Sequence, residues 1–175
     1  MIRDLEIQRL TNYIKGIGLK VTFSSKKEDW SADWYLDNSQ IVIYKDKNVT
    51  KIETILSLIH ELGHALHNVH EKDRQVDTKF ESALDHVDKA EEEEKDTQKR
   101  QRKVIFDNEV AGTQYWHQIY KETNMKFPIW RLDAAMEYDT WQYEVFYETG
   151  SYPSSKEREK KRKESKNKCR SKHND

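Results

Sequence analysis

The stretch Thr50-Lys-Ile-Glu-Thr-Ile-Leu-Ser-Leu-Ile-His60-Glu61-Leu-Gly-His64 puts a metal-binding pattern on a helix whose start can be read from the sequence. Thr50 and Glu53 have the spacing of a capping box, in which each side chain bonds the backbone N–H of the other, so a helix is predicted to begin here. Isoleucine and leucine then recur at helical spacing and predict one broad buried face. This helix decides the fold, because it supplies a large apolar face and also carries chemistry.

Two histidines four residues apart lie on the same face of a helix, so His60 and His64 can offer imidazole nitrogens to one metal ion. Glu61 lies about 100° further round the helix, where its carboxylate can reach a metal-bound water without binding the metal itself. This H-E-x-x-H pattern is typical of zinc peptidases, in which the glutamate is the general base. We therefore expect Zn²⁺ as cofactor, His60 and His64 as ligands, and Glu61 as the catalytic residue.

A catalytic zinc site also needs a third protein ligand. Glu109 lies on the apolar face of a helix predicted over 104–120, where burying a carboxylate is costly unless it meets a cation. His70 is the rival, because its spacing from the two histidines matches the metzincin pattern, although that pattern has a glycine where this chain has His67. Two aspartates are further alternatives, Asp85 and Asp107. We expect Glu109 to be the third ligand.

The remaining elements are mostly helical. Five glycines and two prolines are low counts for 175 residues, which favours helices over a turn-rich all-β fold. Further helices are predicted over 1–17 and 130–147, and short strands are predicted over 19–23, 33–37 and 40–44, with a turn at Asp37-Asn38 and a polar loop over 45–48. We therefore expect an α+β fold: a mostly helical domain over residues 1–153, with a small three-stranded sheet packed against the H-E-x-x-H helix.

Charge is distributed unevenly along the chain. Residues 156–175 carry a net charge of +6, and residues 1–155 carry −7. Residues 71–103 are also dominated by charge and have few apolar positions, so we expect a solvated helix extension or a mobile insert there. Residues 154–175 show no apolar periodicity, and we expect a disordered basic tail. Such a tail could make weak nucleic-acid contacts through residues 156–172, because lysine and arginine neutralise phosphates.

Composition also bears on location. Charged residues make up 36% of the chain, and no apolar run approaches the roughly 20 residues needed to cross a bilayer, so we expect no membrane partner. The first ten residues lack the apolar segment of a secretory signal. Cys169 is the only cysteine, which excludes an internal disulfide. Together these features favour the cytoplasm.

The run from Gln40 to His67 consists of a β-branched strand, a short loop and the helix Ile-Leu-Ser-Leu-Ile-His-Glu-Leu-Gly-His-Ala-Leu-His. It resembles the ImmA/IrrE-type zinc peptidases and, more generally, the gluzincins. In those families a strand precedes the H-E-x-x-H helix, and a glutamate on a later helix, often followed closely by alanine, completes the site. Asn108-Glu109-Val110-Ala111 has that form. The resemblance covers about residues 19–119 and implies a zincin-like fold and regulatory cleavage of an intracellular protein.

We therefore expect a zinc-dependent peptidase that hydrolyses peptide bonds of an intracellular protein, with a protein or peptide as its substrate. Three residues on the helix after Glu109 are candidates to stabilise the oxyanion: Tyr115, His117 and Tyr120. The strand Gln40–Tyr44 could align an extended peptide if it lies at the edge of its sheet. Two alternatives remain open: a non-catalytic, peptidase-like regulatory binding protein, and a protease tethered to nucleic acid by the basic tail.

Overall fold

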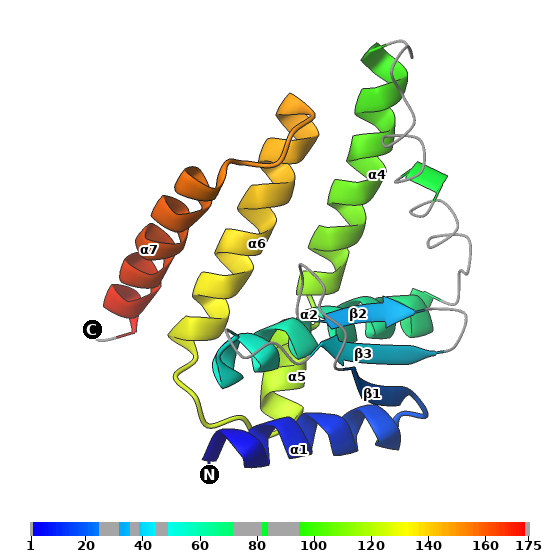
Figure 1. The fold of residues 1–175 in the computed structure, drawn as a ribbon, viewed down its shortest axis with the longest axis vertical. Helices are drawn as coiled ribbons and strands as arrows, with labels where there is room; N and C mark the ends of the chain where they lie inside the picture. The colour runs from blue at the N-terminus through cyan, green and yellow to red at the C-terminus, as the bar shows by residue number, and fades with distance from the viewer. Residues whose placement is uncertain are drawn as a thin grey trace. The chain divides into compact units, whose positions relative to one another are not determined.

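A computed structural model describes most of the chain, namely residues 2–24, 32–35, 39–44, 49–71, 82–83 and 95–173. The described elements form an α+β fold that is mostly helical and includes a three-stranded sheet (Figure 1). They divide into two compact units, Met1–Glu71 with Gln114–Lys126, and Lys72–Thr113 with Phe127–Asp175. The predicted turn at Asp37-Asn38, the loop over 45–48 and most of the charged insert lie outside the described residues.

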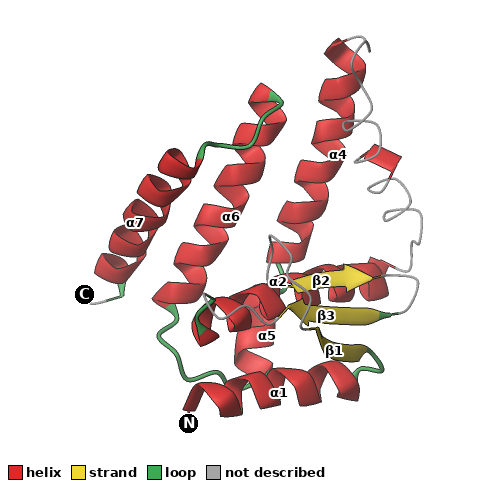
Figure 2. Ribbon diagram, viewed as in Figure 1, coloured by secondary structure: helices red, strands yellow, loops and turns green. Residues whose placement is uncertain are grey.

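The first unit contains the sheet and the H-E-x-x-H helix (Figure 2). Its elements are α1 (Ile2–Gly16), β1 (Lys20–Ser24), β2 (Ala32–Tyr35), β3 (Gln40–Tyr44), α2 (Lys51–Glu71) and α5 (Trp116–Glu122). Helix α2 packs against β2 and β3, which confirms the expected position of the sheet. The sheet has the order β1-β3-β2, with β3 parallel to β1 and antiparallel to β2.

Strand β3 is the centre of this sheet. Its side chains alternate between the two faces, and Ile41 and Ile43, two residues apart, are both buried. Because β3 is paired on both sides, its backbone groups are already used in the two ladders. Strand β3 is therefore not an edge strand, and its backbone is not open to pair with an extended substrate peptide.

Helix α2 begins where the capping box predicted. The backbone N–H of Thr50 donates to Glu53 Oε2 at 2.8 Å, and the N–H of Glu53 donates to Thr50 Oγ1 at 3.3 Å. Four members of its apolar face are completely buried, Ile55, Leu58, Ile59 and Leu62. Each such side chain contributes about 1.5–3 kcal/mol by leaving water. The helix that carries the two histidines is therefore held firmly in the core of its unit.

Positive-φ residues end two helices of the first unit. After α1, Gly18 (φ 86°) donates its N–H to Lys15 O and Leu19 donates to Ile14 O, the two bonds of a Schellman motif. Asn124 (φ 50°) takes the equivalent position after α5. These ends turn the chain sharply and place Leu19 in the core immediately before β1.

The second unit is built from three long helices, α4 (Lys95–Thr113), α6 (Trp130–Thr149) and α7 (Ser155–Lys172). Helix α6 packs against both of the others. Ile105 and Phe146 are buried in a small apolar cluster with Val104 and Tyr143. No helix in the described ranges of either unit combines the length and apolar character that crossing a membrane requires.

The single helix predicted over 104–120 is wrong, because the chain breaks at Gln114 and Tyr115 and forms α4 and α5 instead. The hydroxyl of Thr113 donates to the carbonyl of Val110 at 2.7 Å. Such a bond offers the last turn of α4 an alternative to continuing the helix. The break separates the segment carrying Glu109 from the segment carrying the aromatic residues that follow it.

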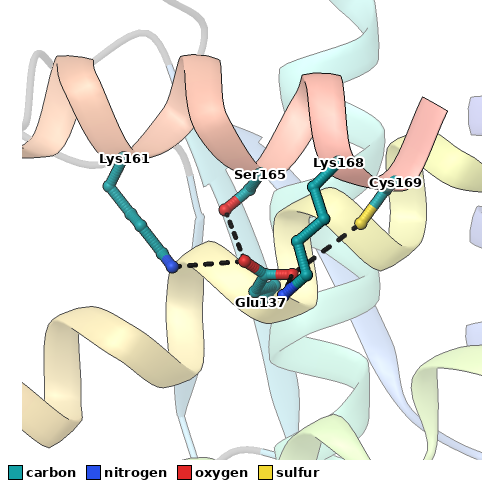
Figure 3. A network of polar contacts seen from close by, with 5 residues as sticks. All are labelled: Glu137, Lys161, Ser165, Lys168 and Cys169. Atoms are coloured by element: carbon teal, nitrogen blue, oxygen red, sulfur yellow. Dashed lines mark hydrogen bonds and ion pairs between the residues drawn. The ribbon is translucent and has the colours of Figure 1, made fainter. Parts of the chain in front are cut away.

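The expectation of a disordered basic tail is also wrong, because residues 155–172 form helix α7. Ser154 and Glu157 make a second capping box at its start. The helix packs on α6 through small residues, and Ser165 and Cys169 are buried. Figure 3 shows that both approach the carboxylate of Glu137 on α6. Apolar periodicity is therefore not what holds this helix.

Candidate metal centre

Helix α2 brings the imidazoles of His60 and His64 together. Their Nε2 atoms lie 3.2 Å apart, and the rings meet edge to face with 4.7 Å between centroids. Two nitrogen ligands of a tetrahedral zinc ion, each about 2.0–2.1 Å from the metal, lie about 3.3 Å from one another. The observed distance therefore fits two ligands of one ion. His64 is buried and His60 is half-buried, so the pair is largely shielded from water.

Glu61 lies beside this pair. Its Oε1 is 3.8 Å from His60 Nε2, and the two side chains are 15% and 18% exposed, respectively. The carboxylate thus faces the same nitrogen that would bind a metal, yet it retains some access to solvent. A general base needs both properties, because it must reach the water that attacks and exchange its proton afterwards.

Trp116, at the start of α5, is a residue of this site that the sequence reasoning missed. Its ring packs edge to face on His60, with 5.7 Å between centroids, and it is 3% exposed. Its buried Nε1 has no hydrogen-bond partner among the described residues. Sequence offered no signal for this contact, since the two residues are far apart in the chain and an aromatic residue inside an amphipathic helix is usually part of the core.

The three oxyanion candidates take different environments on and beside α5. The ring of Tyr115 lies 6.4 Å from that of His67 on α2, so this tyrosine packs against the H-E-x-x-H helix. His117 is exposed and lines an open surface hollow with Gln118 and Lys121. Tyr120 is half-buried. The contact with His67 therefore places the ring of Tyr115 beside the helix that carries the proposed ligands.

The candidates for the third ligand also separate by environment. Glu109 on α4 is buried, with 5% of its surface exposed. Asp107 is exposed and accepts a 2.7 Å bond from Lys103 one turn earlier, as an ordinary surface carboxylate does. Helix α2 continues to Glu71 without the turn at His67 that the metzincin pattern requires. Asp85 and the side chain of His70 lie outside the described residues.

The local geometry thus provides a close histidine pair, a neighbouring carboxylate and a buried aromatic wall, all within the first unit. No protein-family model, curated protein or solved structure matches the chain. The likeness to ImmA/IrrE-type peptidases and gluzincins therefore rests on the motif residues alone.

Proposed function

We propose that this chain is a zinc-dependent peptidase that hydrolyses peptide bonds of an intracellular protein. The observation that carries the proposal is the 3.2 Å separation of the Nε2 atoms of His60 and His64, with the Glu61 carboxylate beside them. The donors that we propose for the metal ion are two imidazole nitrogens, from His60 and His64, and one carboxylate oxygen, from Glu109. We take Glu109 as the third ligand because it is buried, whereas Asp107, two residues earlier, is exposed and bound by Lys103.

The chemistry divides between the ion and the chain. When bound, zinc lowers the pKa of a coordinated water and polarises the scissile carbonyl. Glu61 accepts the proton of the attacking water and passes it to the nitrogen of the leaving amine as the C–N bond breaks. The packed face of α2 and the ring of Trp116 hold the imidazole of His60 in a fixed orientation. The lack of any internal disulfide is consistent with a cytoplasmic site of action.

Metal binding is tested first. Two imidazoles joined by a hydrogen bond can have the same N–N distance as two ligands of one metal ion, so the distance between His60 and His64 does not by itself identify a metal site. The chain has five tryptophans, and Trp116 packs on His60. A Co²⁺ ion at the site should quench the fluorescence of that indole. We expect one Co²⁺ per chain and quenching that is lost in His64→Ala and greatly reduced in Trp116→Phe, whereas Trp141→Phe should retain it. Absence of stoichiometric metal binding by the wild type would overturn the proposal.

The third ligand is tested with two carboxylates on the same helix. Glu109→Gln keeps the side-chain size but weakens a metal ligand, whereas Asp107→Asn removes an exposed charge two residues away. We expect Glu109→Gln to raise the dissociation constant for zinc by at least tenfold and Asp107→Asn to leave it unchanged. Equal affinities in the two variants would exclude Glu109, and the same measurement on His70→Gln would then examine its rival.

Catalysis is tested separately from metal binding with Glu61→Gln, which retains the ligands and removes the base. Cleavage of an unfolded protein such as casein by the zinc-loaded chain should fall by about 10²–10⁴-fold, the usual contribution of a general base. Zinc content should not change. A chain that binds zinc but shows no cleavage dependent on Glu61 would instead be a non-catalytic, peptidase-like regulatory protein.

A further inference from the structure

Helix α7 has one face that is buried against α6 and one exposed face that is rich in lysine and arginine. Ser165 and Cys169 are buried on the face toward α6, and Lys161 is half-buried beside them. With a rotation of about 100° per residue, a set of five cations falls on the side away from Ser165. All are exposed, and they span about 21 Å along the helix. We call this set the basic face: Lys156, Lys160, Lys163, Lys166 and Arg170.

The acidic residues of α7 leave the basic face with a net positive charge. Glu157 belongs to the capping box, where it accepts bonds from the N–H and hydroxyl of Ser154. Glu159 and Glu164 form exposed i,i+4 pairs with Lys163 and Lys160. Exposed pairs of this kind contribute only about 0–1 kcal/mol, so a phosphate oxygen can replace the carboxylate at little cost.

The other three members of the basic face differ from Lys160 and Lys163. Within the described part of the chain, Lys156, Lys166 and Arg170 form no ion pair, and their side chains are exposed. Lys161 and Lys168, by contrast, bind Glu137 on α6. Lys161 and Lys168 therefore anchor the helix, whereas the members of the basic face lie on its exposed side.

We propose that the basic face binds the phosphate backbone of nucleic acid without sequence preference. The face carries no aliphatic or aromatic side chain, since the positions between the cations are Glu159 and Asn167. A membrane-binding helix needs apolar side chains to insert, and the centre of a protein interface needs aromatic or aliphatic anchors. Phosphate binding needs neither, because release of condensed counterions supplies the driving force. This inference does not depend on the metal site.

The proposal predicts how steeply the affinity for nucleic acid falls as the salt concentration rises. Each phosphate neutralised on duplex DNA contributes about −0.9 to the slope of log K against log salt concentration. Contacts from about four of the five cations predict a slope near −3.6. Affinity should then fall about 150-fold between 50 and 200 mM salt. A disordered tail could show a similar slope, but substitutions on its inner and outer residues would have equal effects.

The experiment is fluorescence anisotropy of the full chain with a 20-base-pair DNA duplex, an RNA duplex of the same sequence, and phosphatidylserine vesicles as probes, at several salt concentrations. The triple variant Lys156→Gln, Lys163→Gln, Arg170→Gln should lower the magnitude of the slope by about 1.8–2.7, the share of two or three of the four phosphate contacts. Glutamine is a good helix former, so α7 should persist, and circular dichroism checks this. A matched variant, Lys15→Gln, Lys20→Gln, Lys121→Gln, removes three exposed cations from the other unit.

We expect the matched variant to bind both duplexes like the wild type and the vesicles to compete weakly. His64→Ala should also bind like the wild type, which separates this proposal from the metal site. Equal losses in the two triple variants would overturn the basic face as the binding surface. Tighter binding to vesicles than to either duplex would overturn nucleic acid as its partner.

Discussion

Replacing Glu137 with glutamine should loosen α7 from α6. The Glu137 carboxylate accepts a bond from Lys161 Nζ at 3.2 Å and lies 2.8 Å from Lys168 Nζ (Figure 3). Ser165 Oγ donates to it at 3.2 Å, and Cys169 Sγ lies 3.9 Å away. Burial raises the pKa of the Cys169 thiol, so the thiol stays protonated and can donate. Since the buried residues of α7 are small, one charged acceptor binds most of its inner face.

The magnitude follows from the exposure of the partners. Glu137 and Lys161 are 25% and 23% exposed, whereas Lys168 is 56% exposed. Hydrogen bonds to charged groups contribute about 1.5–3 kcal/mol when desolvated. Exposed ion pairs contribute about 0–1 kcal/mol. Glutamine keeps an acceptor oxygen but loses the charge, so we expect the attachment to weaken by about 1–2 kcal/mol.

Hydrogen exchange measures this attachment directly. A loss of about 1–2 kcal/mol corresponds to amide exchange in α7 that is about 5–30 times faster, if exchange proceeds through local opening. Peptides from α2 provide an internal reference, because that helix lies in the other unit. Glu148→Gln, at an exposed position of α6, the helix that carries Glu137, is the matched control. If α7 exchanges at the same rate in both variants, the network does not hold the helix and the reasoning fails.

The same carboxylate predicts a pH dependence. Burial raises the pKa of Glu137, but the hydrogen bonds from Lys168 and Lys161 outweigh burial and hold the pKa below its ordinary value of 4.5. A group whose pKa is lower in the folded state contributes stability above its unfolded pKa and loses that contribution as pH falls through the folded value. The difference in melting temperature between wild type and Glu137→Gln should therefore be full above about pH 4.5 and shrink below it. A constant difference from pH 7 to pH 3 would contradict this assignment.

Two further substitutions test the helix ends. Gly150→Ala should destabilise the protein by about 1–2 kcal/mol or more, because Gly150 has φ 78° and an added Cβ would lie 2.6 Å from Arg102 Nη1. Gly16→Ala is the control and should not destabilise the protein, because Gly16 has open space around it. Thermal unfolding of the two alanine variants checks this, and equal melting temperatures would refute it. Thr50→Ala removes the cap of α2 and should cost about 1 kcal/mol, seen as a lower melting temperature. Asn12→Ala, at an exposed position inside α1, should not lower the melting temperature, because alanine is the better helix former.

The features that could be predicted from sequence depend on neighbours in the chain. The capping box of Thr50 and Glu53 joins residues three apart, and the apolar periodicity after it is a property of one helix. Strand β3 was likewise visible because its β-branched residues are consecutive. The pairing of β3 on both sides could not be predicted from sequence, because β1 pairs with β3 although β2 lies between them in the chain.

Helix α7 shows why the rest was missed. Its contacts join Ser165 and Cys169 to Glu137, 28 and 32 residues earlier, and they use a carboxylate and small polar groups in place of an apolar stripe. A search for apolar periodicity finds nothing in such a segment, although the capping box of Ser154 and Glu157 was a local signal that could have been read. Charge composition alone therefore led to the expectation of disorder.

The proposed metal site likewise combines a local part, which sequence can predict, with a part that depends on tertiary packing. The 3.2 Å distance between the Nε2 atoms of His60 and His64 arises from residues one turn apart, so the backbone of α2 and the side-chain rotamers determine it. A third ligand must come from another element, and no periodicity within α2 can identify it. Burial is the property that distinguishes Glu109 from Asp107, and burial depends on tertiary packing. For this reason the comparison of Glu109→Gln with Asp107→Asn tests the part of the site that sequence reasoning was least able to assign, while His64→Ala tests the part it assigned best.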